Sequence, residues 1–515
     1  MSSVTSPKKK KVAIPKDVGP IEKLVLKENQ GPHTERLEEI LSEQYCAFDM
    51  SSLGSGKTYT TSELSLRLEF SHVIVICPAS LEAKWKDMTK YGVKLAKVIS
   101  YQGLRSRVNA VPRHGLLRRH DSIDEGTFFT ATDEYERLID EGTLVVFDEV
   151  QHIKNKNDQF LACQALTSSI LRSGGISRFI FLSGTPIDKE EQSIHMMQIM
   201  GMIRSQKLSI FNKEENRLKL IGAQELVDFC KAIDPVATLD FLRLHPFNRD
   251  NIHHNCYLIF QKIVKKNIAV AMPSPSLEID VKNGYYRIEN EDDKRKLVKG
   301  IIQLQTSVMF NEKEGTVNVA AGTFANIAPS LAMIESAKIN TMARIAIEKL
   351  DSNPDCKVGL FVNYNDSIAR LTELMKDYKP LVLNGQVDKK HRQPILTKFQ
   401  ANNDHHRLII GNIHVCSTGI DLDDKFGNRP RFAFAIPNYK ILDLHQLTRR
   451  FIRLDSKSVP VFRFVYGNVG RKESSILNSL SRKSTVLAQT LESQVQSDPD
   501  LKFPGELPTV EEDEE

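Results

Sequence analysis

The sequence predicts an α/β fold made of two parallel-sheet lobes with a helical insertion between them. Short apolar, β-branched runs alternate with helix-compatible stretches over residues 31–205 and again over residues 331–470. Between them, residues 206–275 carry few strand signals. In the first lobe each apolar run ends in a polar cluster, and the carboxyl ends of parallel strands line the ligand crevice of such sheets. We therefore expect one shared site at these ends.

Length and composition exclude several classes of protein. The chain has 515 residues, 41% hydrophobic and 26% charged, which is typical of a soluble globular protein with two to four domains. No run of eighteen apolar residues is present and no apolar segment follows the N-terminus, so we expect no membrane span and no secretion. Seven cysteines without a C-x-x-C pair favour an intracellular, reducing compartment. His253, His254 and Cys256 lack a second ligand pair, so no metal site is expected there.

The charge is distributed unevenly. The net charge is +5, but residues 498–515 hold eight acids and one lysine, and the rest has 69 Lys+Arg against 57 Asp+Glu. A basic body with an acidic tail is typical of a protein that binds a polyanion. The tail either competes for the basic groove or only keeps the chain soluble. Residues 1–30 read as a disordered basic tail, in which the Lys8–Lys11 run is a nuclear import signal, a phosphate-binding arm or a solvated end.

The first lobe contains a phosphate-binding loop. Residues 46–48 read as the end of a buried strand, the stretch from Tyr59 to Leu68 as a helix, and Gly54-Ser55-Gly56-Lys57-Thr58 lies between them. The glycines let backbone N–H groups approach an anion, Lys57 brings a charge to the β- and γ-phosphates, and Thr58 brings a hydroxyl to Mg²⁺. Ser51 stands where the first glycine of the G-x-x-x-x-G-K-[ST] pattern belongs.

Three further strands of this lobe end in polar residues. Val73–Cys77 ends at Pro78, Leu144–Phe147 at Asp148-Glu149, and Phe179–Leu182 at Ser183-Gly184-Thr185-Pro186. A phosphate-binding loop needs a carboxylate for Mg²⁺ and a group that orients or deprotonates the attacking water. Asp148 fits the first role and Glu149 the second.

The remaining segments are predicted in chain order. Residues 206–275 look helical, and 276–306 read as a strand, a turn at Asn283-Gly284, a second strand and a charged helix. Residues 307–330 read as a loop. The second lobe has strands at 357–362, 380–383, 408–411, 431–436 and 461–466, with helices at 338–350, 367–376, 391–400 and 444–452. Residues 471–497 look helical, and the chain from Asp498 onward looks disordered.

Two arginines of the second lobe are candidates for the same site. Gln446, Arg450 and Arg453 are spaced by four and three residues, which places them on one face of the predicted helix. Arginines that reach a γ-phosphate from a separate lobe stabilise the transition state of phosphoryl transfer. Arg449 is adjacent and faces nucleic acid instead in this interpretation.

Taken in order, these blocks resemble a superfamily 2 helicase/translocase with two RecA-like lobes. The resemblance covers about residues 31–470 and rests on the phosphate-binding loop, Cys77–Leu81 with Trp85, Asp148–Gln151, Ser183–Pro186, Thr418–Asp421 and Gln446–Arg453. Pro78-Ala79-Ser80-Leu81, Trp85-Lys86 and Asp148–Asn155 are similar to the Swi/Snf-type branch. Phe48-Asp49-Met50-Ser51 is similar to helicase-like ATPases of large DNA viruses. The location expected from the Lys8–Lys11 run is the nucleus or a viral replication site.

The resemblance also implies roles for individual residues. ATP and Mg²⁺ would be the cofactors, and Asp421 would lie near the ribose of ATP. The nucleic-acid backbone would be touched by Pro78, Ser80 and Thr418. Ser183 and Thr185 would couple hydrolysis to lobe movement. Three positions depart from the family pattern. His33 is followed by Thr34 where the family often has His-Gln for reading adenine, Gln151 replaces a histidine, and Arg449 replaces a glycine.

The function expected from sequence is therefore an ATP-driven motor on nucleic acid, with DNA favoured over RNA. The expected partners are transcription or replication proteins. A strand-separating DNA or RNA helicase is the alternative within the same class, and a catalytically silent nucleic-acid-binding scaffold is the alternative from another class. A small kinase would leave the second lobe unexplained.

Overall fold

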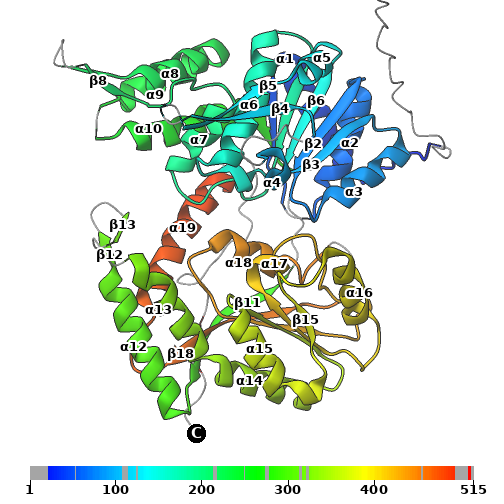
Figure 1. Cartoon of the computed structure of the whole chain (residues 1–515), viewed down its shortest axis with the longest axis vertical. Coiled ribbons are helices and arrows are strands. Elements are labelled where there is room, and N and C mark those ends of the chain that lie inside the picture. The colour runs from blue at the N-terminus through cyan, green and yellow to red at the C-terminus, as the bar shows by residue number, and fades with distance from the viewer. Residues whose placement is uncertain are drawn as a thin grey trace, which may run out of the picture.

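The computed structural model describes residues 21–52, 54–106, 114–122, 124, 126–212, 217–248, 250–272, 278–311, 316–319, 324–453, 456–492 and 509–511. Two parallel sheets form two lobes, one above the other in Figure 1. The Lys8–Lys11 run and most of the acidic tail lie outside the described residues. In the described part of the chain, no helix is long and apolar enough to cross a membrane.

The first lobe is built on a six-stranded sheet in the order β10-β1-β7-β6-β2-β3, and every neighbouring pair is parallel. Its strands are β1 (Cys46–Asp49), β2 (His72–Cys77), β3 (Leu95–Ser100), β6 (Thr143–Asp148), β7 (Arg178–Leu182) and β10 (Ala269–Val270). β1 and β6 are buried along their whole length and β7 is buried after Arg178, as their apolar sequences predict. Their carboxyl ends carry the polar clusters that the sequence places there.

Helices and hairpins surround this sheet. The helices are α1 (Gln30–Glu43), α2 (Lys57–Arg67), α3 (Glu82–Asp87), α4 (Tyr101–Leu104), α5 (Asp133–Asp140), α6 (Asp158–Ser173) and α7 (Glu191–Ile199). The hairpins are β4 (Leu117–Ser122) with β5 (Gly126–Ala131), and β8 (Ile210–Asn212) with β9 (Arg217–Lys219). The expected helical segment follows as α8 (Ile221–Ile233), α9 (Pro235–Leu244), α10 (Ile252–Ile259) and α11 (Lys265–Ile268), with a π-helical turn at Phe260–Val264.

The second lobe has a seven-stranded parallel sheet in the order β15-β16-β14-β17-β18-β11-β19. Its strands are β11 (Asp280–Arg287), β14 (Lys357–Val362), β15 (Leu381–Leu383), β16 (Leu408–Asn412), β17 (Arg431–Ala435), β18 (Val461–Asn468) and β19 (Thr509–Glu511). Separate buried clusters pack the sheet against its helices. These helices are α12 (Glu291–Ser307), α13 (Phe324–Ser336), α14 (Ile339–Ser352), α15 (Asn365–Leu374), α16 (Lys389–Gln400), α17 (Ile413–Cys416) and α18 (Ile441–Thr448).

The predicted insertion over residues 206–330 is divided between the lobes. After α11 the chain adds β10 to the first sheet, and β11 then pairs in the second sheet. The predicted turn at Asn283-Gly284 is wrong, because β11 runs straight through both residues. Gly284 is needed for packing instead, since a Cβ there would lie 2.4 Å from the ring of Tyr286.

The segment predicted as a loop at 307–330 forms regular structure in its described residues, 307–311, 316–319 and 324–330. It contains the hairpin of β12 (Val308–Asn311) and β13 (Thr316–Val319) and the start of α13. Part of the tail expected to be disordered, Thr509–Glu511, pairs as β19 with β11 at the edge of the sheet. Pairing with a strand more than 200 residues away leaves no local signal in the sequence.

A C-terminal helix joins the two lobes. α19 (Ser474–Glu492), red-orange in Figure 1, starts beside the second sheet and rises to the first lobe. Val486 packs against the core of the first lobe. The ammonium group of Lys483 donates to the carbonyl oxygen of Tyr439 in the second lobe. The helix predicted at 471–497 is therefore confirmed over the described residues, and it contacts both lobes.

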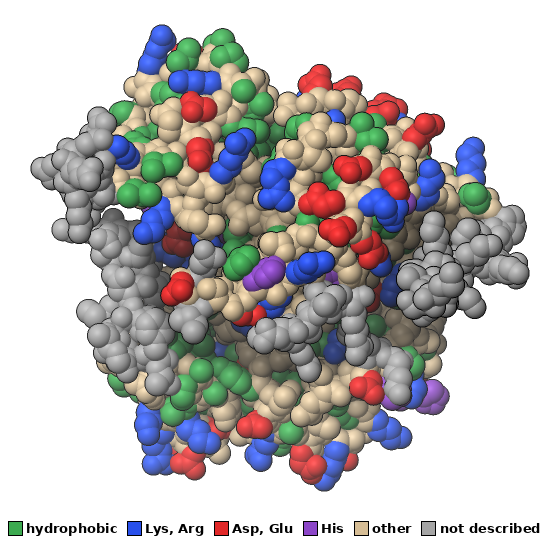
Figure 2. All heavy atoms as spheres, turned by 45° about the horizontal axis from the view of Figure 1, so that its top comes forward, with side chains coloured by type: hydrophobic (Ala, Val, Ile, Leu, Met, Phe, Trp, Pro, Cys, Tyr) green, Lys and Arg blue, Asp and Glu red, His purple; other side chains and the backbone are tan. Residues whose placement is uncertain are grey.

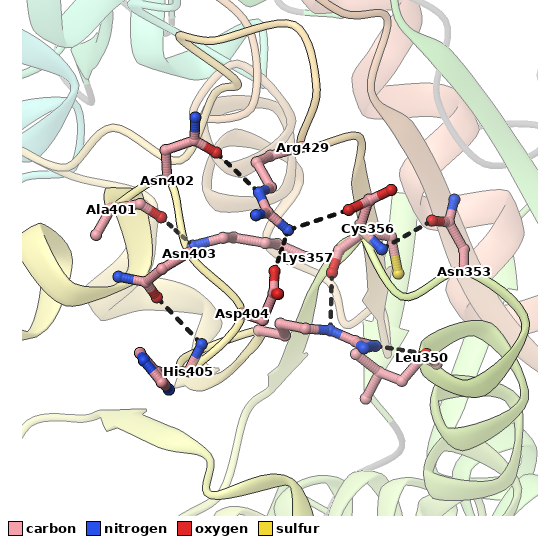
Figure 3. A network of polar contacts seen from close by, with 12 residues as sticks. Leu350, Asn353, Cys356, Lys357, Ala401, Asn402, Asn403, Asp404, His405 and Arg429 are labelled. Atoms are coloured by element: carbon pink, nitrogen blue, oxygen red, sulfur yellow. Dashed lines mark hydrogen bonds and ion pairs between the residues drawn. The ribbon is translucent and has the colours of Figure 1, made fainter.

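A polar network closes the amino ends of the second sheet (Figure 3). Lys357 is fully buried and donates to the carbonyl oxygen of Phe399 at 2.7 Å. It also donates to the carbonyl oxygen of Ala401 at 2.6 Å, as Figure 3 shows. Burial lowers the pKa of Lys357 to about 8. Arg429 donates to Asn402 at 2.9 Å and forms an ion pair with Asp404. These contacts fix the end of α16 on the sheet.

Candidate nucleotide and nucleic-acid site

The phosphate-binding loop lies between β1 and α2, as predicted. Gly54 and Gly56 have φ of +81° and +96°, which glycine adopts without strain. Lys57 is 8% exposed, and its ammonium group donates to the carbonyl oxygens of Ser51 at 2.8 Å and Ser52 at 3.1 Å. The hydroxyl of Ser55 is buried and has no hydrogen-bond partner among the described residues.

These features fit a polyphosphate. The N–H groups at the start of α2 have no carbonyl partner within the helix, and the helix dipole is positive there. Thr58 at the start of α2 and Asp148 at the end of β6 supply the oxygen ligands that Mg²⁺ prefers. ATP with Mg²⁺ is therefore compatible with the residues present.

The loop has a buried support that the sequence did not reveal. Asp49 is fully buried, with its carboxylate 3.0 Å from Nε2 of His33 and 2.9 Å from the N–H of Ser51. The charges of His33 and Lys57 counter the effect of burial and hold the pKa of Asp49 below its usual value. The hydroxyl of Ser51 accepts from the N–H of Met272 at 2.9 Å. The serine that stands in place of the expected glycine therefore adds a hydrogen bond that glycine could not make.

Gln30 is the clearest residue that sequence reasoning missed. Its side-chain amide donates to the carbonyl oxygen of Ser55 at 2.9 Å and accepts from the N–H of Lys27 at 2.9 Å. A Cβ on Gly56 would lie 2.2 Å from Nε2 of Gln30, so the glycine makes room for this contact. The available signal was a glutamine at the beginning of the helix before the loop, three residues ahead of His33.

The acidic pair occupies the carboxyl end of β6. Asp148 is 5% exposed, and Trp85 donates to its Oδ2 at 2.8 Å. Burial raises the pKa of Asp148 to about 6, and the neighbouring charge of Glu149 acts in the same direction. Glu149 has a φ of +55°, a conformation that costs energy in a residue other than glycine and is concentrated at functional sites.

A hydrogen-bond chain connects the acidic pair with the segment after β7. The amide nitrogen of Gln151 donates to Glu149 Oε2 at 2.6 Å, and its oxygen accepts from the hydroxyl of Ser183 at 2.6 Å. The N–H of Thr185 donates to the same hydroxyl at 3.0 Å. Gly184 approaches the phosphate-binding loop so closely that a Cβ would lie 2.9 Å from the carbonyl oxygen of Ser51. The phosphate-binding loop, the acidic pair and the segment after β7 thus share one site.

The arginines of the second lobe reach this site, but not from one helix. α18 ends at Thr448, so Gln446 lies on the helix while Arg450 and Arg453 follow it. The carbonyl of Arg450 accepts from the N–H of Leu422 at 2.7 Å, and the fully buried Phe451 packs its ring against Phe361 and Phe462. These tertiary contacts end the helix, so the prediction of one face over Gln446, Arg450 and Arg453 is wrong.

Both guanidinium groups are nevertheless held at the edge of the second lobe that faces the first. Arg450 is 7% exposed and donates to the carbonyl oxygen of Ser417 at 2.7 Å. Burial lowers the pKa of Arg450 to about 10, Arg453 acts in the same direction, and the negative charges of Glu149 and Asp421 oppose the shift. Arg453 donates to Asp421 at 2.7 Å. The expected place of Asp421 beside a ribose is thus taken by an ion pair.

The lobes meet at two points of the site. A Cβ on Gly54 would lie 3.5 Å from Cδ of Arg453, which puts this side chain against the phosphate-binding loop. A Cβ on Gly419, next to Thr418, would lie 3.0 Å from Cβ of Ser80. Figure 2 shows the hollow between the lobes, with Lys, Arg and His side chains along its upper rim.

In addition, Nε2 of Gln446 is buried with no hydrogen-bond partner in the described part of the chain.

Comparison with known proteins gives one family match, over part of the chain. Residues 337–425 match the family described as the helicase conserved C-terminal domain. No curated protein matches the chain. The SWI2/SNF2 ATPase core of Sulfolobus solfataricus in complex with dsDNA is 15% identical, with a TM-score of 0.32 over 93% of this chain and 98% of that chain. A second structure of that ATPase core domain is 14% identical, with a TM-score of 0.31 over 87% of each chain.

Proposed function

We propose that the chain is an ATP-driven motor that moves along nucleic acid, with DNA favoured over RNA. The observation that carries the proposal is the position of Arg453, whose side chain crosses from the second lobe to the phosphate-binding loop of the first. Such a site is complete only when the lobes close, so binding and hydrolysis of a nucleotide between them can drive their relative movement. The helicase C-terminal match over residues 337–425 supports the same class.

The proposed chemistry divides among five positions. Lys57 binds the β- and γ-phosphates in place of the Ser51 and Ser52 carbonyls, and Thr58 with Asp148 holds Mg²⁺. Bound there, Mg²⁺ neutralises charge on the β- and γ-phosphate oxygens. Glu149 orients and deprotonates the attacking water, while Gln151 keeps its carboxylate in place at 2.6 Å.

The second lobe completes the site in this proposal. Arg450 and Arg453 stabilise charge on the transferred phosphoryl group, and the unpaired amide nitrogen of Gln446, among the described residues, is free to donate to it. Arg453 must exchange its ion pair with Asp421 for a phosphate. ATP therefore competes with a contact within the second lobe.

Nucleic acid is assigned to the edge where Ser80 lies beside Gly419, the neighbour of Thr418, while Pro78 is buried just before this edge. Ser80 is exposed and lies beside Gly419 of the other lobe, so a strand bound there touches both lobes. Ser183 and Thr185 form part of the chain that ends at Glu149, which suits a coupling role between lobe movement and hydrolysis. Transcription or replication proteins are the proposed partners, and the viral resemblance stays a hypothesis from sequence.

The test is an ATPase assay with no nucleic acid, single-stranded DNA, duplex DNA and RNA in parallel. We expect the largest stimulation with duplex DNA, and loss of turnover in Lys57→Ala without loss of folding. The side chain of Lys57 donates its hydrogen bonds to two carbonyls of the loop, so we expect its truncation to leave the core intact. Turnover within twofold of the unmodified protein in a clean Lys57→Ala preparation would contradict the phosphate-binding role. Unwinding of a labelled duplex would favour the strand-separating alternative, and binding without turnover would favour the scaffold.

A further inference from the structure

The sequence contains one tryptophan, and the structure places it on a carboxylate of the site. Trp85 lies in α3, is fully buried, and donates its indole N–H to Oδ2 of Asp148 at 2.8 Å. Tyr101 donates its hydroxyl to the backbone carbonyl of Asp148 at 3.0 Å. Two aromatic side chains from outside β6 therefore fix both the carboxylate and the backbone of this residue.

The segment that carries Trp85 also forms the edge that faces the other lobe. Pro78 ends β2, the N–H of Leu81 donates to the carbonyl of Pro78 at 2.9 Å, and the N–H of Trp85 donates to the carbonyl of Leu81 at 3.1 Å. Ser80 lies within this turn, exposed and next to Gly419. Two consecutive backbone hydrogen bonds thus join the Ser80 turn to the backbone of Trp85, so we expect a displacement of the turn to move Trp85.

The hydrogen bond from Trp85 to Asp148 does more than provide an acceptor for a buried N–H group. A buried indole N–H needs some acceptor, and backbone carbonyls serve this purpose elsewhere in the lobe. Tyr135 is an example, since it is fully buried and donates to the carbonyl of Leu166 at 3.0 Å. Trp85 instead uses a carboxylate, and a hydrogen bond to an ionised acceptor is about twice as strong as a neutral one. It also has a defined direction, so it sets the orientation of Asp148.

We propose that Trp85 is a positioning residue through which contact of nucleic acid with the Pro78–Ser80 turn aligns the carboxylate of Asp148 and so stimulates ATP turnover. The inference rests on the proposed function, since it assigns a route by which the nucleic-acid edge acts on the nucleotide site. Trp85 itself touches neither ligand in this assignment. It acts only by orienting the two carboxylate oxygens of Asp148.

The first experiment compares Trp85→Phe with the matched control Tyr135→Phe, which also loses one buried donor, but one that bonds to the carbonyl of Leu166 and not to Asp148. Turnover is measured with and without duplex DNA, and DNA affinity by anisotropy of a labelled duplex. We expect Trp85→Phe to keep DNA affinity within about twofold while the ratio of stimulated to unstimulated turnover falls at least about fivefold. Tyr135→Phe should keep the ratio of the unmodified protein. An unchanged ratio in Trp85→Phe would overturn the proposal.

The second experiment uses the indole as its own probe and does not depend on turnover. Because Trp85 is the single tryptophan, its emission reports one position in the chain. We expect Mg²⁺ with ADP to change this emission, and duplex DNA alone to change it as well. If labelled DNA and labelled ADP both bind and the emission stays constant, the proposed route is wrong.

Two safeguards keep the outcomes distinct. If Trp85→Phe fails to fold by circular dichroism, benzothienylalanine at position 85 keeps the bicyclic volume and removes only the N–H donor. It should then show the same reduced ratio, and a normal ratio would overturn the proposal.

If the unmodified protein is not stimulated by any nucleic acid, the proposed function fails. If it is stimulated and both Trp85 variants behave in the same way as the unmodified protein, only the inference about Trp85 fails.

Discussion

At the scale of single residues, the site depends on side chains that are held before any ligand arrives. Glu149 combines a strained backbone, with φ of +55°, and a 2.6 Å hydrogen bond from Gln151. Gln151 is in turn fixed by Ser183. A carboxylate positioned in this way would lose little orientation when substrate binds, which suits the base role proposed for Glu149.

Glu149→Gln should bind ATP with Mg²⁺ and hydrolyse it very slowly. The amide keeps the shape of the side chain but cannot accept the proton of the water, and general-base catalysis typically contributes about 10²–10⁴-fold. Nucleotide affinity from equilibrium titration and single-turnover rates measure the two properties separately. A variant that folds but no longer binds nucleotide would mean that Glu149 contributes to binding and not to activation of water.

Arg453→Lys should fold, retain much of its affinity for ATP and nucleic acid, and lose most stimulated turnover. Lysine keeps the charge but loses the planar pair of donors that suits a phosphate, and this contribution is made mainly in the transition state. Arginine fingers are worth about 10³–10⁵ in rate. Arg450→Lys should behave similarly and Arg449→Lys more mildly, in stimulated kcat measured side by side. Normal turnover in Arg453→Lys would mean that another residue serves as the finger.

At the scale of elements, one buried ion pair anchors the start of α19. Lys338 and Glu473 are 0% and 1% exposed, with 2.9 Å between Nζ and Oε2. Lys338 also donates to the carbonyl oxygen of Val465, and Glu473 accepts from the N–H of Gly467. The pair ties α14 and β18 to the helix that continues to the first lobe.

Lys338→Met should lower the free energy of unfolding by about 3–5 kcal/mol, because it leaves the carboxylate of Glu473 buried and without its cation. Chemical denaturation followed by circular dichroism measures the loss. The control is Lys376→Met, which removes the exposed pair of Lys376 with Glu373 at 3.1 Å and should have no measurable effect. Equal stability of Lys338→Met and the unmodified protein would show that the buried pair contributes nothing net.

The elements also show what a single sequence can predict. The phosphate-binding loop and Asp148-Glu149 were predicted because a buried strand followed by its polar end is a local pattern. The course of β11 through Asn283-Gly284 was not, because a turn signal within a strand is overridden by pairing with β18 and β19. Gln30 was missed for a similar reason, since its contact with Ser55 joins residues 25 positions apart.

At the scale of the whole molecule, the proposed interaction with nucleic acid depends on charge. The proposed contacts at Pro78, Ser80 and Thr418 are mostly to phosphates, which carry no base sequence. We expect duplex DNA affinity to fall steeply and linearly in a plot of log affinity against log salt, with a slope near −0.9 for each phosphate neutralised. Binding isotherms between about 50 and 200 mM salt measure the slope. A flat plot would contradict a phosphate-dominated interface.

The position of β19 bears on the three described residues of the acidic tail, and the two alternatives for the tail as a whole stay open. β19 lies five strands from β16 in the second sheet, roughly 24 Å at the usual strand spacing, while Thr418 follows β16. This separation exceeds the Debye length of about 8 Å at physiological salt. Residues 509–511 therefore cover the edge of β11 at a distance from the proposed nucleic-acid edge, and competition for the groove is not their expected role.

Removal of residues 509–515 should expose the edge of β11 and cause self-association. The deletion uncovers the backbone donors and acceptors of Asn283, Gly284 and Tyr285, and a bare strand edge is a template for pairing with another chain. Light scattering and size-exclusion chromatography over a range of concentrations should show larger species than the full chain forms. The matched control replaces Glu512, Asp513, Glu514 and Glu515 by amides, which removes charge but keeps β19. Association of the control to the same extent would mean that repulsion between acidic tails, and not the covered edge, keeps the molecules apart. If the deletion stays as monodisperse as the full chain, the edge of β11 does not need its cover.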